Sequence, residues 1–244
     1  MALLSDKKYI AFWGYPDPVV MKNIKTDYPE AEWLDLDVEF DAPDFNILPD
    51  VSCKIIKNLV NNALYYKDSI VKVIAAIGKE KCDSGWYVAH LLKKMGFDVI
   101  ETKFENLETR KPIVYSTSNL PLIDKINLIM NSIPSPIIQQ CEYVKPKFGF
   151  WGVPPNDIEI LKLFPNETHV YGWTRCCEAG VPADLELEMF VDEDVPTVFY
   201  AQAFCAKGAL AKYLADKYSG LYIDIDDYAT NSVRAKIEAF LRLR

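Results

Sequence analysis

Short apolar runs alternate with amphipathic stretches along the chain. Runs such as 9–13 and 197–201 have the length and composition of buried parallel strands. A stretch such as 52–66 instead places apolar residues at helical spacing, so one face of a helix there is hydrophobic. This alternation predicts an α/β fold in which helices cover mainly parallel sheets.

The element boundaries follow from the same pattern. The expected strands are 9–13, 32–37, 71–77, 98–102, 148–151, 169–173, 197–201 and 221–225. One expected helix begins near Asp17, and the others cover 52–66, 83–95, 121–131, 156–164, 205–218 and 232–243. The segment 183–190 alternates like a strand, although its place in the chain favours a helix.

The pattern is written twice. Phe-Trp-Gly-x-Pro occurs at 12–16 and again at 150–154, and Cys-x-x-Gly precedes a helix at 82–85 and at 205–208. A weaker match pairs the helices at 121–131 and 232–243. Because self-similarity of this kind marks duplicated structural units, we expect two Rossmann-like or flavodoxin-like lobes. Their expected extents are 1–140 and 141–244, with a ligand-binding cleft between them.

Composition narrows the classes of partner. The formal net charge of −8 and the absence of basic runs exclude nucleic acid as a main partner. No apolar run approaches the roughly 18–20 residues that cross a bilayer, so no membrane partner is expected. The first residues lack the layout of a signal peptide. We therefore expect a soluble cytoplasmic protein whose six cysteines are reduced thiols.

Candidate ligand-binding residues follow the predicted strands. In open α/β sheets, ligands bind at the carboxyl ends of the strands, where Gly lets the backbone approach and Arg binds carboxylate or phosphate. The residues expected to bind a small-molecule ligand are Trp13, Gly14, Trp151, Gly152, Thr174 and Arg175. Asp35 and Asp37 lie on one face of a strand near the same edge. They are candidates for acid–base groups or for ligands of a hard cation. The simpler interpretation is that both are solvated acidic residues.

Cys82 and Cys205 are a symmetric pair of candidate catalytic residues. Each precedes a helix, where the positive end of the helix dipole favours a thiolate. If the two lobes face one another, these thiols approach across the cleft. The simpler alternative is that both are small half-buried residues retained from the duplication.

A metal site is a further hypothesis for the same region. Cys176 and Cys177 follow the second strand of the second lobe, and with Cys82 and Cys205 they provide the thiolates that bind zinc or an iron–sulfur cluster. No Cys-x-x-Cys spacing supports it, so the fold would have to gather the ligands.

Three functions stay open on this basis. The first is a protein that binds a Cys-ligated metal or iron–sulfur cluster and acts on a small anionic metabolite. The second is a paired-cysteine enzyme without cofactor; in overall plan this resembles the aspartate/glutamate racemases, which use one cysteine from each of two α/β lobes. Those enzymes carry a hydroxyl residue close after each cysteine, whereas here Cys82 is followed by Asp83-Ser84 and Cys205 by Ala206-Lys207. The third is a binding module without catalysis.

Overall fold

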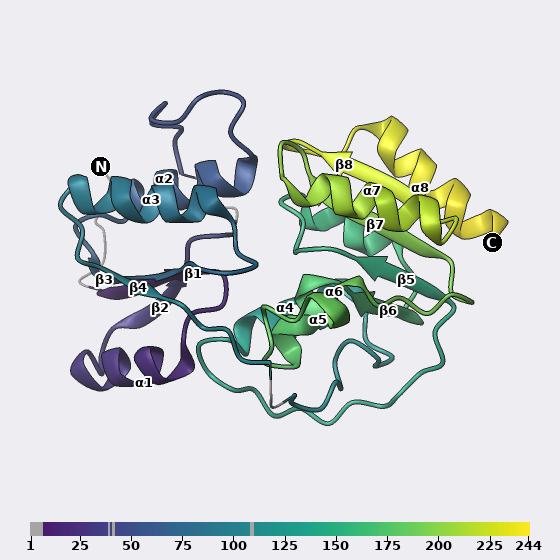
Figure 1. Cartoon of the computed structure of the whole chain (residues 1–244), viewed down its shortest axis with the longest axis horizontal. Helices are drawn as coiled ribbons and strands as arrows, with labels where there is room; N and C mark the ends of the chain where they lie inside the picture. The colour runs from purple at the N-terminus through teal and green to yellow at the C-terminus, as the bar shows by residue number, and fades with distance from the viewer. Residues whose placement is uncertain (1–6, 39, 41, 108–109) are drawn as a thin grey trace. The chain divides into compact units, whose positions relative to one another are not determined.

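The computed structural model describes residues 7–38, 40, 42–107 and 110–244, and it confirms an α/β fold with two similar parallel sheets (Figure 1). The backbone contacts divide the chain into two compact units, Met1–Glu105 and Asn106–Arg244. Each sheet has four strands, and the two strand orders are equivalent: β2-β1-β3-β4 and β6-β5-β7-β8.

In the first unit, helices cover both faces of the sheet (Figure 1). The strands are β1 (Tyr9–Trp13), β2 (Glu32–Asp35), β3 (Ile70–Ala76) and β4 (Val99–Thr102). The helices are α1 (Pro18–Asp27), α2 (Lys54–Tyr65) and α3 (Asp83–Lys94). The α2 and α3 helices pack on one face, where Leu34, Leu59 and Val88 belong to one buried apolar cluster. The α1 helix lies on the other face (Figure 1).

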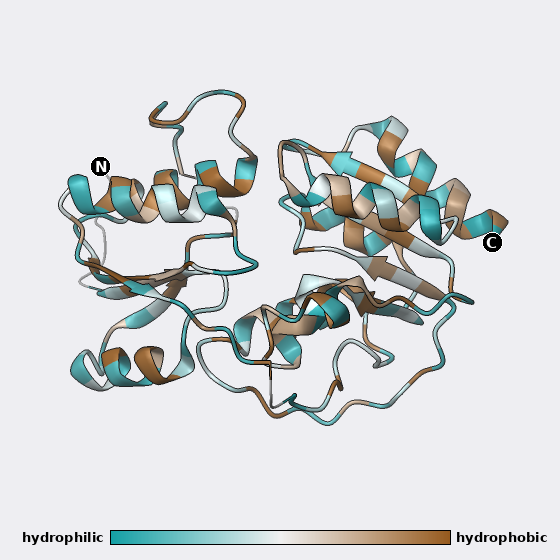
Figure 2. Cartoon of the chain, in the orientation of Figure 1, coloured by the Kyte–Doolittle hydropathy of each residue, from teal (hydrophilic) through white to brown (hydrophobic). Residues whose placement is uncertain are grey.

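The second unit repeats this plan with additional helices. Its strands are β5 (Phe148–Trp151), β6 (Thr168–Tyr171), β7 (Thr197–Gln202) and β8 (Leu221–Ile225). Its helices are α4 (Leu122–Asn131), the 3-10 helix η1 (Ile158–Leu163), α5 (Trp173–Glu178), α6 (Leu185–Met189), α7 (Lys207–Lys217) and α8 (Asn231–Leu243). One sheet face packs against α7, and the opposite face packs against α4, η1 and α8. In Figure 2 the central strands are mainly hydrophobic, whereas the helices carry both kinds of residue.

The α4 helix belongs to the second unit. Leu122 and Ile126 are buried in the same cluster as Phe150 and Ile237, and Ile237 comes from α8. The boundary of the compact units therefore lies between residues 105 and 106, whereas the repeat predicts lobes of 1–140 and 141–244. Both helices of the weaker match, 121–131 and 232–243, pack within this one unit, and their equivalence stays a prediction.

A buried lysine fixes α4 to the second sheet. Lys125 is fully buried, and its ammonium group donates to the carbonyl oxygens of Asn166 at 2.7 Å and Thr168 at 2.6 Å. Burial lowers the pKa of Lys125 to about 8, because desolvation disfavours the charged form. Two backbone carbonyl oxygens thus serve as hydrogen-bond partners of this buried ammonium group.

One segment departs from the predicted structure, and one open alternative is decided. The expected strand at 169–173 ends at Tyr171, because Gly172 has φ +74° and α5 starts at Trp173. The segment 183–190, which fitted two patterns, contains the short helix α6. Among the described residues, no helix is long and apolar enough to cross a membrane.

Candidate functional site

Each sheet has one position where consecutive connections leave in opposite directions. From β1 the chain goes to β2 on one side and then to β3 on the other, so this switch point lies between β1 and β3. The loops after these two strands contain Gly14 and Cys82. The equivalent point between β5 and β7 has Gly152 and Cys205 in its loops. Ligands of open α/β sheets bind outside such switch points, and the predicted residues thus lie at the expected edge of each sheet.

Trp13 carries an unpaired polar atom at the first switch point. Its side chain is only 4% exposed, and its indole nitrogen Nε1 is buried without a hydrogen-bond partner. Nε1 lies against the first turn of α3, since a Cβ atom placed on Gly85 would be 3.3 Å from it. Gly85 thus lets the indole N–H reach the start of the helix.

The α3 helix begins without a side-chain cap. Cys82 occupies the N-cap position with an extended backbone, and its side chain makes no capping hydrogen bond. The first amide N–H groups of an α-helix have no partner inside the helix, and they attract negative charge. The start of α3 therefore combines helix amides, an exposed thiol and the indole N–H of Trp13.

At the second switch point, the equivalent tryptophan and glycine both have hydrogen-bond partners within the second unit. The Trp151 indole N–H donates to the carbonyl oxygen of Glu188 at 2.6 Å. The Gly152 carbonyl oxygen accepts from the hydroxyl and the amide of Thr174, at 3.0 and 3.3 Å. A Cβ atom on Gly152 would come 2.8 Å from the carbonyl oxygen of Tyr200, so this glycine permits close packing of the backbone.

Arg175 holds the α6 segment. It is buried, and its Nη2 atom donates to the carbonyl oxygens of Leu187 at 2.7 Å and Phe190 at 2.6 Å. The guanidinium group also lies over the rings of Tyr171 and Phe190, at 4.8 and 5.2 Å from their centroids. Thr174 and Arg175 thus have partners within the second unit, and their predicted role in ligand binding stays a prediction.

Among the described residues, three buried side-chain atoms lack a hydrogen-bond partner: Trp13 Nε1, Thr168 Oγ1 and Arg175 Nε. Arg175 uses another nitrogen for two hydrogen bonds, and the hydroxyl of a threonine can rotate toward an acceptor. The indole of Trp13 has one donor only, so all of its hydrogen-bonding capacity is unused.

Asp35 and Asp37 form a hydrogen-bonded pair at the end of β2. The Gly14 N–H donates to Asp37 Oδ2 at 2.6 Å, and the Asp37 N–H donates to Asp35 Oδ1 at 3.0 Å. Burial raises the pKa of Asp37 to about 6, and burial together with the neighbouring Asp37 charge raises the pKa of Asp35 well above its usual value. Asp35 alternates with Leu34 and Leu36 of the cluster under α2 and α3, so it lies on the opposite face from Trp13.

The surroundings of Cys176 in α5 disfavour a role as metal ligand. Cys176 is fully buried, its Sγ atom lies 3.7 Å from the carbonyl oxygen of Asp184, and burial raises its pKa to about 12. Metals bind the thiolate, which this environment disfavours. In the described parts of the chain, no three His, Cys, Asp or Glu side chains gather to hold a metal ion. A zinc or iron–sulfur site formed with Cys177, Cys82 and Cys205 stays a prediction.

Cys82 and Cys205 occupy different positions in their helices. Cys82 is the N-cap of α3 and is exposed, whereas Cys205 precedes the N-cap Ala206 of α7 and is half-buried. None of the six cysteines forms a disulfide. The pairing of Cys82 with Cys205 stays a prediction, because the two thiols belong to separate units.

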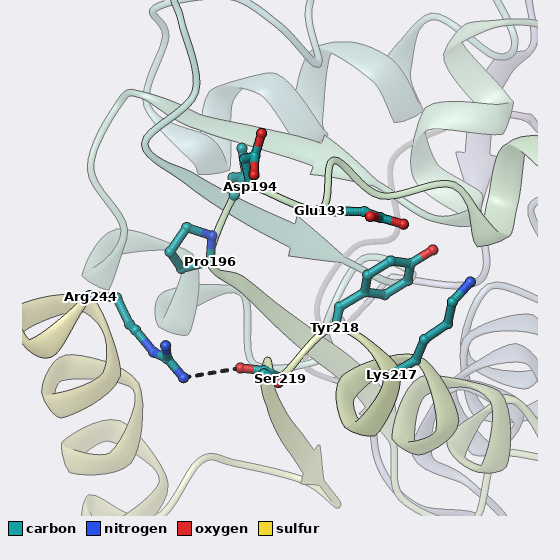
Figure 3. A pocket seen from close by; sticks show the side chains of 8 residues that line it. Glu193, Asp194, Pro196, Lys217, Tyr218, Ser219 and Arg244 are labelled. Atoms are coloured by element: carbon teal, nitrogen blue, oxygen red, sulfur yellow. Dashed lines mark hydrogen bonds between the residues drawn. The ribbon is translucent and has the colours of Figure 1, made fainter.

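A hollow of about 440 Å³ lies at the opposite edge of the second sheet, and Figure 3 shows its lining. Glu193, Asp194 and Pro196 border it before β7, and Lys217 and Arg244 border it from the ends of α7 and α8. Arg244 donates to the carbonyl oxygen of Ser219 at 3.3 Å, and Lys217 lies over the Tyr218 ring. Acidic and basic groups are thus mixed around this hollow, and none of the residues predicted for the site lies there.

Comparison with models of known protein families gives no match, and comparison with curated proteins gives none either. Gly85 was not among the predicted site residues, although it ends the Cys-x-x-Gly motif at 82–85 and lies in the first turn of α3. The spacing of this motif could have indicated the role of Gly85, since it places a residue without a side chain in the first turn of α3.

Proposed function

We propose that the first unit binds a small anionic metabolite, through its carboxylate or phosphate group, at the start of α3 beside Trp13. The observation that carries this proposal is the unpaired indole N–H of Trp13 against the first turn of a helix without a side-chain cap. An acceptor with negative charge satisfies both the indole and the helix amides. The thiol of Cys82 is exposed at the same helix end.

The cost of the unpaired donor supports a ligand. A buried donor without an acceptor destabilises a fold by about 1–3 kcal/mol, and such atoms are rare in native proteins. The duplicated unit shows that this fold is able to satisfy the same indole, because Trp151 donates to Glu188. The first unit keeps its copy unpaired, which is expected where the acceptor belongs to a ligand.

The nearby carboxyl pair is compatible with an anion. Asp35 lies on the face of the sheet away from Trp13, and the raised pKa values of Asp35 and Asp37 keep the pair partly protonated below about pH 6. Asp37 is further held by the Gly14 N–H. The repulsion that two ionised carboxylates would exert on a bound anion is thereby weakened.

The test is a titration that observes the indole N–H groups by two-dimensional ¹H–¹⁵N NMR. Inorganic phosphate and malonate are the probes, and chloride at matched ionic strength is the control. We expect the Trp13 resonance, identified by its absence in Trp13→Phe, to shift in a saturable manner. Bound probe should also raise the unfolding temperature, since a ligand of the native state stabilises it.

Trp151→Phe is the matched control variant. It removes the equivalent indole in the second unit, so it should lower stability through the unpaired Glu188 carbonyl and leave anion binding intact. A Trp13 resonance that responds to no probe, or responds equally to chloride, would overturn the proposal.

A further inference from the structure

We propose that Cys82 is the reacting group of this site, and that the ligand is a small 2-oxo carboxylate. This inference rests on the proposed anion site, and it adds a chemical step and a substrate class to it. The carboxylate would bind the amides at the start of α3 and the indole N–H of Trp13. The adjacent keto carbon would then face the thiol.

The position of Cys82 supports this role. Its side chain stands at the N-cap, the position from which a side chain normally reaches the amides of the first helical turn. Cys82 makes no such bond and is exposed, so its sulfur is available beside the place where an anion binds. A carbon next to a bound carboxylate group is therefore within reach of this sulfur.

The other cysteines lack one of these properties. Cys205 lies one residue outside the cap of α7 and is half-buried, and the indole of its unit is already paired with Glu188. Cys176 is fully buried, and its raised pKa keeps it a neutral thiol. Only the first switch point among the described residues combines an exposed thiol, an uncapped helix and an unpaired indole.

The step is a reversible addition. The sulfur of Cys82 forms a bond to the keto carbon, and the π bond of the carbonyl breaks toward its oxygen. That oxygen takes up the proton that the thiol releases, so the product is a thiohemiketal and no oxidant or further reactant is needed. The electron pair of the sulfur is shared in the new bond, and the carboxylate keeps its charge on the helix amides.

The first test compares alkylation by iodoacetate with alkylation by iodoacetamide, with peptide mass spectrometry at Cys82 and at Cys205. Iodoacetate carries an electrophilic carbon beside a carboxylate, whereas iodoacetamide is its neutral counterpart. In each reaction an S–C bond forms, iodide leaves with the C–I electron pair, and the thiol proton passes to solvent. We expect the iodoacetate-to-iodoacetamide rate ratio to be roughly fivefold higher at Cys82 than at Cys205, as for a favourable helix-end charge interaction.

Trp13→Phe should lower the ratio at Cys82, because one of the two donors for the carboxylate is lost, and inorganic phosphate should bring the ratio down to that at Cys205 in the wild-type protein. A ratio at Cys82 that is unchanged in Trp13→Phe, or equal ratios at the two cysteines in the wild-type protein, would overturn the proposal. Equal ratios with a Trp13 resonance that responds to phosphate would leave the anion site standing without its cysteine chemistry. No response of either kind would remove both.

The second test needs no change of Trp13. Pyruvate labelled with ¹³C at its keto carbon should give a new resonance of a tetrahedral carbon with the wild-type protein and none with Cys82→Ser. Lactate has the same size and charge without the electrophilic carbon, so it should slow iodoacetate at Cys82 but form no adduct. An adduct resonance retained in Cys82→Ser, or none with the wild-type protein, would contradict the proposed step.

Discussion

The carboxyl pair at the end of β2 makes stability depend on pH. The pKa of Asp37 is raised to about 6 and that of Asp35 is also raised, so the folded protein holds protons that the unfolded chain releases near pH 4. Stability from this pair is therefore complete at low pH and is lost as pH rises through the folded pKa. Between pH 4 and 7 we expect the titration of Asp37 alone to reduce the free energy of unfolding by about 2–3 kcal/mol, and Asp35 acts in the same direction.

Asp37→Asn should flatten this dependence in urea unfolding measured at several pH values. The amide oxygen of Asn can still accept from the Gly14 N–H, and the charge that raises the pKa of Asp35 is removed. Asp44→Asn is the matched control, because the Asn46 N–H lowers the pKa of this exposed carboxyl. An unchanged slope in Asp37→Asn would show that the pair is not the origin of the dependence.

At the scale of elements, Glu178 attaches the segment before α4 to α5. Its Oε1 atom accepts from the amides of Val114 at 2.7 Å and Tyr115 at 2.5 Å, and its Oε2 atom accepts from the amide of Ser116 at 3.0 Å and from its hydroxyl. Glu178→Gln places an amide donor among these donors. We expect a loss of about 2–3 kcal/mol in denaturant unfolding, with faster amide exchange at 114–116.

Glu159→Gln is the control for this substitution. Glu159 is an exposed partner of Lys162, and such pairs contribute little to stability, so the free energy of unfolding should change by less than about 0.5 kcal/mol. Equal effects of the two substitutions would mean that Glu178 does not hold the segment.

The elements that sequence reasoning found are those with a one-sided or short apolar pattern. The β1, β5 and β8 strands have the predicted bounds, because short apolar runs between polar connections specify buried parallel strands. The α5 helix was missed because it is buried on all sides: Thr174, Cys176 and Glu178 are all inaccessible, so no polar face gives a helical period. Its start depends on the positive φ of Gly172.

The candidate site was predictable in place but not in detail. The repeat and the sheet topology put Cys82 and Trp13 at a strand edge, and the structure keeps them there. The two copies of Phe-Trp-Gly-x-Pro do not reveal that one indole is paired and the other is not. That difference depends on the carbonyl of Glu188, which a distant segment brings to Trp151.

At the scale of the whole molecule, the two duplicated units differ in the helices that cover their sheets. In the described residues of the first unit, α1, α2 and α3 all follow its first strand, whereas the second unit also uses α4, which precedes its first strand. The amphipathic pattern of α4 shows that one face is buried, but it does not show against which sheet. The repeat therefore predicts a boundary at 140/141, and packing sets the boundary of the compact units at 105/106.

This difference predicts how shortened chains behave. A chain of 106–244 keeps Leu122 and Ile126 in the core and keeps the donors of Glu178. A chain of 141–244 loses all of them, and each deleted core side chain of this size costs about 2–5 kcal/mol, against a total stability of about 5–15 kcal/mol for a typical domain. We expect dispersed NMR spectra and cooperative thermal unfolding for 106–244 and neither for 141–244. Ile126→Ala in the longer chain should have a stability between those of the two chains. It removes one of the two core side chains of α4 and leaves the hydrogen bonds to Glu178. Cooperative unfolding of 141–244 at the temperature of the longer chain would show that α4 is not part of the folding unit.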